Sequence, residues 1–104
     1  MLKHSKAIVC PDSCVLHLAG AFADIPTVAL FGAFSHSDRS LYYRNVTPLH
    51  AFNVCPSAPC RTQKSELPVH RCAQANGWKE GEKFCRAMWA IDPERVTDTV
   101  IQLL

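Results

Sequence analysis

Two short apolar runs, separated by a stretch with helical spacing, constrain the fold of this 104-residue chain more than any other feature. The first run covers residues 6–10 (KAIVC) and stops at Pro11, which cannot extend a ladder of backbone hydrogen bonds. The second covers residues 27–31 (TVALF). Between them, apolar residues recur at helical spacing over residues 14–23, directly after polar residues that can cap a helix. This order predicts a right-handed βαβ unit over residues 1–34, with two parallel, buried strands.

The remainder of the chain shows weaker patterns. Residues 33–44 are polar, as expected of a surface loop that leaves the carboxyl end of a strand. Residues 46–52 (VTPLHAF) predict a short edge strand, because Pro48 excludes a central position in a sheet. Residues 53–86 hold four cysteines and little periodicity, so something other than a large apolar core must order them. Residues 92–104 open with Asp-Pro-Glu and predict a terminal amphipathic helix that packs on the sheet.

Charge and composition exclude several classes of protein. Eleven lysine and arginine residues against nine aspartate and glutamate residues leave a net charge of +2, so the chain lacks the basic stripe of a nucleic-acid binder. No apolar run approaches the roughly 20 residues that span a bilayer, and the N-terminus lacks the features of a signal peptide. We therefore expect a cytoplasmic protein. In that compartment the six cysteines favour reduced thiols or a metal site over a disulfide scaffold.

The turn between the first strand and the helix is a candidate anion site. Asp12 and Ser13 supply polar side chains there, and the backbone amides near Ser13 and Cys14 lie at the positive end of the helix dipole. His17 follows one helical turn later and faces the same ligand-binding side. Ligands of open α/β sheets bind at the carboxyl ends of the strands, so these residues indicate a diphosphate site. In the alternative interpretation Asp12 and Ser13 only cap the helix and His17 is a half-buried structural histidine.

The order of these residues adds a resemblance. The stretch PDSCVLHLAGAFADIPTVALFG, residues 11–32, resembles the signature of the ADP-heptose:lipopolysaccharide heptosyltransferases, glycosyltransferase family 9. That signature is Asp, Ser or Thr, usually Gly, two residues, His, Leu-Ala, then Pro-Thr and Val-Ala-Leu-Phe-Gly. A looser similarity continues to the end of the chain. The resemblance implies a partial Rossmann-like C-terminal half of a GT-B glycosyltransferase, in which a βαβ unit is followed by a cysteine-rich loop and a C-terminal helix.

The same resemblance implies a function and its residues. Asp12, Ser13, Cys14 and His17 would contact an ADP-heptose-like nucleotide sugar, whose sugar passes to a saccharide or lipid-linked acceptor in lipopolysaccharide synthesis. By the same resemblance, the acceptor site and the catalytic base would belong to an N-terminal domain outside this chain. We therefore expect no catalytic residue here, no transfer by this chain alone, no required cofactor, and a cytoplasmic location peripheral to the inner membrane. Cys14 departs from the family, because most relatives have glycine, which lets phosphate approach the backbone closely.

Four cysteines offer a different interpretation of the chain. Cys55, Cys60, Cys72 and Cys85 can converge on one tetrahedral zinc, although their spacing is wider than that of most zinc ribbons. The alternatives are reduced cysteines buried as small apolar residues, or disulfides formed during handling. A bound zinc would favour a small zinc-stabilised interaction module without catalysis. In either case an open edge of the βαβ unit predicts self-association.

A few charged residues in the loops can also meet phosphate. Arg39, Arg44 and Lys64 are the candidates, and the sequence favours solvated surface charge for each of them.

Overall fold

The computed structural model describes residues 2–22, 24–60, 72 and 85–104. Its regular elements, in chain order, are η1 (Leu2–His4), β1 (Ile8–Pro11), α1 (Cys14–Ala21), β2 (Thr27–Phe31), α2 (His36–Ser40), β3 (Val46–His50), η2 (Phe52–Val54), α3 (Arg86–Trp89) and α4 (Pro93–Leu103). Within these residues, no helix is long enough and apolar enough to cross a bilayer.

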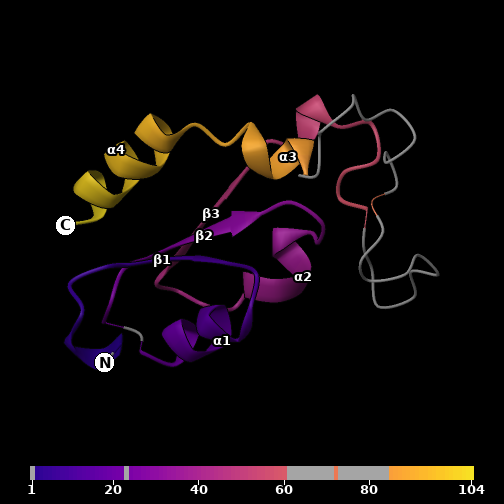
Figure 1. Ribbon diagram of the computed structural model, residues 1–104. Helices are drawn as coiled ribbons and strands as arrows, with labels where there is room; N and C mark the ends of the chain where they lie inside the picture. The colour runs from indigo at the N-terminus through magenta and orange to yellow at the C-terminus, as the bar shows by residue number, and fades with distance from the viewer. Residues whose placement is uncertain (1, 23, 61–71, 73–84) are drawn as a thin grey trace.

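Three parallel strands form the central layer, in the order β1-β2-β3. Ile8 of β1 lies beside Thr27 of β2, which in turn lies beside Val46 of β3. Helices α1 and α2 cover one face of this sheet, and α3 and α4 lie on the other (Figure 1). This arrangement confirms the predicted βαβ unit and makes the chain a partial Rossmann-like α/β fold.

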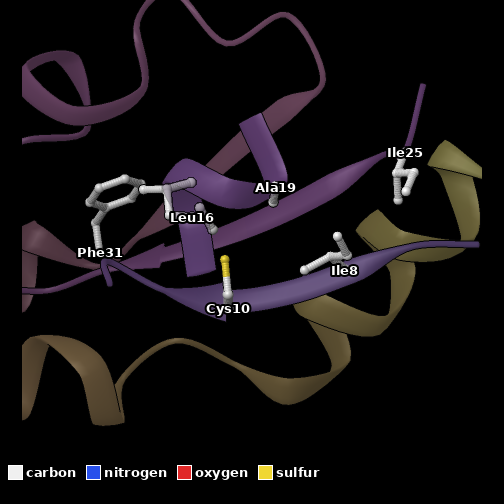
Figure 2. Packing of buried hydrophobic residues seen from close by; sticks show 7 residues of the cluster. Ile8, Cys10, Leu16, Ala19, Ile25 and Phe31 are labelled. Atoms are coloured by element: carbon white, nitrogen blue, oxygen red, sulfur yellow. The ribbon is translucent and has the colours of Figure 1, made fainter. Parts of the chain in front are cut away.

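The central strand β2 alternates between two apolar clusters because successive side chains of a strand point to opposite faces. Ala29 and Phe31 pack against α1, together with Leu16 and Ala19 of that helix and Cys10 of β1 (Figure 2). Phe31 and Leu16 are both fully buried. Truncating such a leucine to alanine typically costs about 2–5 kcal/mol, so this cluster holds α1 to the sheet.

The second cluster lies on the opposite face, below the C-terminal helix. Val28 of β2 and Leu49 of β3 pack with Ile91, and Val96 and Val100 of α4 cover them. The helix begins as its sequence predicts, because the Asp92 side chain accepts a hydrogen bond of 2.9 Å from the Glu94 N–H and proline follows at the first turn.

Some expectations need correction. The strand expected at residues 6–10 runs from Ile8 to Pro11, and its two faces are not both buried. Val9 is 49% exposed because β1 is at the edge of the described sheet, and the α4 side chains cover β2 and β3 instead. The segment 33–44, expected as a loop, contains α2, which is too short to show helical periodicity.

The edge strand expected at residues 46–52 is β3, and it ends at His50. Pro48 lies beside Ala29 in this strand, at the edge where a proline is tolerated. Within the cysteine-rich segment 53–86, the structure describes residues 53–60, 72, 85 and 86. The short helix α3, which no pattern in the sequence predicts, starts at the end of that segment.

Candidate functional site

Helix α1 begins directly after β1, at the carboxyl end of the sheet. Ser13 is extended and caps the helix: its Oγ accepts a 3.3 Å hydrogen bond from the Val15 N–H, and its carbonyl accepts a 3.0 Å bond from the Leu16 N–H. The capping interpretation is therefore confirmed for Ser13, but not for Asp12. Neither bond uses the backbone N–H of Cys14, and the Cys14 side chain is exposed. The positive end of the helix dipole thus lies at an accessible turn.

The carboxylate of Asp12 pairs with an arginine of α2, the short helix that follows β2. Arg39 Nε lies 3.6 Å from Asp12 Oδ2, and both side chains are largely buried, at 28% and 15% exposure. The Arg39 guanidinium also lies over the ring of Phe34, 4.0 Å from its centroid. Interpreting Arg39 as a solvated charge was therefore wrong. Helix α2 turns the loop back toward the start of α1, an arrangement that no local pattern in residues 33–44 indicates.

His17 lies one turn into α1 and is exposed, so the expectation of a half-buried histidine is wrong. Its Nδ1 lies 2.8 Å from the Tyr43 hydroxyl, and the two rings meet edge to face with centroids 5.9 Å apart. Tyr43 comes from the segment between α2 and β3. Tyr43 was not predicted as a site residue. Nothing in the sequence distinguishes it from the adjacent Tyr42, which is 91% exposed.

Gly20 makes room for Tyr43. A Cβ atom at this position would lie 2.7 Å from the Tyr43 ring, closer than real Cβ contacts. The ring can therefore lie flat against the helix one turn after His17. The predicted site residues Asp12, Ser13, Cys14 and His17 thus lie at the start of α1, Asp12 just before it and Ser13 at its N-cap. The structure adds Arg39 and Tyr43 to them.

Helix α2, which carries Arg39, is held by a stack of aromatic rings. His36 of α2 stacks on His50 of β3, with centroids 5.4 Å apart and an interplanar angle of 11°, and His50 stacks on Phe52 at 4.2 Å. Arg95 Nη1 donates a 3.2 Å hydrogen bond to the His50 carbonyl. Burial, and then the charges of His36 and Arg95, lower the pKa of His50, which favours the neutral imidazole in this stack.

Cys10 lies in the apolar cluster below the turn. Burial raises the pKa of its thiol, and the nearby Asp12 carboxylate raises it further. The residue is therefore a protonated thiol at neutral pH and acts as a small apolar core residue.

The four remaining cysteines, at positions 55, 60, 72 and 85, are each half-buried. Over residues 2–22, 24–60, 72 and 85–104, no three His, Cys, Asp or Glu side chains form a group that could hold a metal ion. The zinc site stays a prediction. Its spacer residues 61–71 and 73–84, including Lys64, lie outside the described part of the chain.

Comparison with known proteins adds one match. The family model of glycosyltransferase family 9 (heptosyltransferase) matches residues 1–70, which include the candidate site on α1, the Arg39 helix and Tyr43. No curated protein and no solved structure matches the chain.

Proposed function

Because the chain belongs to glycosyltransferase family 9, we propose that it binds the nucleotide-sugar donor of a glycosyl transfer at the start of α1. In this proposal the chain corresponds to the C-terminal, donor-binding half of a GT-B enzyme. The donor is an ADP-heptose-like sugar nucleotide, and the acceptor is a saccharide or lipid-linked sugar of the lipopolysaccharide type. The reaction takes place in the cytoplasm, at the surface of the inner membrane.

The pairing of Arg39 with the α1 turn is the observation that supports this proposal best. A diphosphate carries only hydrogen-bond acceptors, and Arg39 uses Nε toward Asp12, so its terminal N–H groups remain for phosphate oxygens. Phe34 supports the guanidinium from one side. The Cys14 N–H and the dipole of α1 add positive potential at the same turn. Asp12 then orients Arg39 and limits the net positive charge at this turn.

Binding of ADP tests this proposal in the 104-residue chain itself. We expect ADP to shift the backbone amide signals of Ser13 and Cys14 in NMR spectra. Arg39→Gln should weaken binding about tenfold to a hundredfold, because a hydrogen bond to a charged group contributes about 1.5–3 kcal/mol. Arg44→Gln is the matched control, because Arg44 is exposed and follows in the same loop. Unchanged amide signals, or equal losses in the two variants, would contradict the proposal.

A second expectation concerns Asp12→Ala. The change should release Arg39 and weaken ADP binding, while the Ser13 cap remains and limits the loss of stability. Equal ADP affinity in the variant and in the unchanged chain, compared at equal folded fraction, would show that Asp12 has no part in donor binding.

We also propose that this chain does not transfer sugar alone. Transfer needs an acceptor hydroxyl, a base and the anomeric carbon of the donor aligned together. At the described α1 turn, the Asp12 carboxylate is already engaged by Arg39. Incubation of the purified chain with an ADP-sugar and a saccharide acceptor should give no transfer above the rate without protein. Family membership favours this donor-binding function over a zinc-stabilised interaction module.

A further inference from the structure

Tyr43 and His17 form a side-chain pair that the motif alone does not explain. The Tyr43 hydroxyl lies 2.8 Å from Nδ1 of His17, across 26 residues of sequence. The imidazole nitrogen is a much stronger base than a phenol oxygen, so in the neutral pair the hydroxyl donates and Nδ1 accepts. A neutral imidazole carries one proton, which must then be on Nε2.

Protonation of His17 does not change the state of Nε2. In the imidazolium both nitrogens carry protons, and the Tyr43 hydroxyl can rotate to accept from Nδ1 instead of donating to it. Nε2 is therefore a hydrogen-bond donor in both charge states of the ring. An acceptor-only ligand such as a phosphate oxygen fits a nitrogen of this kind.

The Tyr43 ring is held firmly enough to favour the His17 tautomer with its proton on Nε2. Gly20 leaves space that any side chain would fill, and Tyr43 packs against the cluster that includes Leu16. Its backbone is also held, because its N–H donates to the Ser40 carbonyl at 3.0 Å and its carbonyl accepts from the Val46 N–H at 3.3 Å. The hydroxyl thus meets His17 from a rigid support.

We propose that Tyr43 is a positioning residue that keeps the proton of His17 on Nε2, so that His17 donates a hydrogen bond to a phosphate oxygen of the donor nucleotide. The proposal rests on the proposed function, because it assigns His17 to the same diphosphate. Tyr43 itself does not touch the ligand. Its hydroxyl acts through the tautomer and the orientation of the imidazole.

The tautomer can be measured directly in the complete 104-residue chain labelled with ¹⁵N. In its neutral form the His17 ring should give one protonated Nε2 signal and one unprotonated Nδ1 signal. Tyr43→Phe keeps the ring against Gly20 and removes the hydroxyl, so both tautomers should appear. Tyr42→Phe is the matched control, because Tyr42 is exposed, and it should leave the His17 signals unchanged.

The affinity for ADP separates positioning from general structural support. Tyr43→Phe should weaken ADP binding about threefold to tenfold, the loss expected for one hydrogen bond. In His17→Gln, whose amide nitrogen is near the position of Nε2 but has no tautomers, the additional Tyr43→Phe change should have no further effect on affinity. A tautomer mixture in the unchanged chain, or equal losses of affinity in the two backgrounds, would overturn the positioning role. Failure of the unchanged chain to bind ADP would overturn the proposed function, while the tautomer measurement would still report on the pair.

Discussion

Asn45 should contribute measurably to stability because its side chain closes the C-terminal end of α1. Its Nδ2 lies within hydrogen-bonding distance of three carbonyl oxygens, those of Ala19 at 2.9 Å, Phe22 at 3.1 Å and Ile25 at 2.7 Å. Two N–H bonds serve three acceptors, so two full hydrogen bonds are the limit. The Oδ1 atom is buried without a hydrogen-bond partner in the described part of the chain.

The loss of stability expected in Asn45→Ala depends on which hydrogen bonds the three carbonyl oxygens still accept. The Ala19 carbonyl still accepts from the Phe22 N–H, and the Phe22 carbonyl from the Ile25 N–H. The Ile25 carbonyl still accepts from the Thr27 hydroxyl. No acceptor is left without a donor, so the loss is that of two hydrogen bonds at about 0.5–1.5 kcal/mol each, or about 1–3 kcal/mol in total. Removal of the unpartnered Oδ1 brings the expected value to the lower half of this range.

Asn45→Asp should be worse than Asn45→Ala although it keeps the shape of the side chain. A carboxylate would face three carbonyl oxygens with no donor, and a buried, unpaired charge costs about 2 kcal/mol or more beyond the lost bonds. The surroundings should raise the pKa of the introduced carboxyl in the folded state above its unfolded value of about 3.9. The folded variant then binds the proton more tightly, so its deficit should shrink as the pH falls toward 4.

Urea unfolding at pH 7.5 and pH 5 measures both effects. Asn53→Ala and Asn53→Asp are the controls, because Asn53 is exposed in η2, and each should change the free energy of unfolding by less than about 0.5 kcal/mol. If Asn45→Asp were as stable as Asn45→Ala at pH 7.5, or if both matched the unchanged chain, the assigned role of Asn45 would be refuted.

Other predictions concern the histidine stack, the helix contact and the metal. The pKa of His50 is lowered in the folded chain, mainly by burial. Its contribution to the free energy of unfolding should therefore be complete above the unfolded pKa of about 6.5 and be lost as the pH falls through the folded pKa. His50→Gln should flatten this dependence in urea unfolding between pH 7.5 and 5.5, and an unchanged slope would contradict it. Gly20→Ala gains up to about 1 kcal/mol in helix propensity but should lose about 1–3 kcal/mol by displacing Tyr43, so a variant more stable than the unchanged chain would argue against the close contact. Zinc bound by the four cysteines would appear as one equivalent per chain in elemental analysis of protein purified under reducing conditions, and Cys55→Ser would lower it; a content near zero would remove the zinc hypothesis.

The elements with strong periodic patterns could be predicted from the sequence. Residues 28–31 are apolar without interruption because β2 is central and both of its faces are covered. The helix at the C-terminus was predictable because Asp92 and Pro93 mark its start and its apolar residues fall on one face. These signals are local, so they can be found before the tertiary structure is known.

The exposure of β1 was not predictable in the same way. Its sequence alternates only weakly, and the apolar Val9 suggests a buried position. Which strand lies at the edge depends on the strand order, and which face is covered depends on where α4 packs. A pattern of five residues indicates neither. The short helices α2 and α3 were not predicted for a related reason, because four or five residues hold too little periodicity.

The candidate site depends most on the segment with the weakest pattern. Residues 33–45 fix α1 at three points: Arg39 pairs beside its first turn, Tyr43 binds His17 within it, and Asn45 caps its last carbonyls. These contacts join residues 20 to 27 positions apart in the sequence, and each depends on the position of a single side chain. In the proposed function the motif on α1 binds the donor, and the segment 33–45 determines how firmly that motif is held. Substitutions of Arg39, Tyr43 or Asn45 should therefore lower ADP affinity more than substitutions in α4, on the opposite face of the sheet (Figure 1).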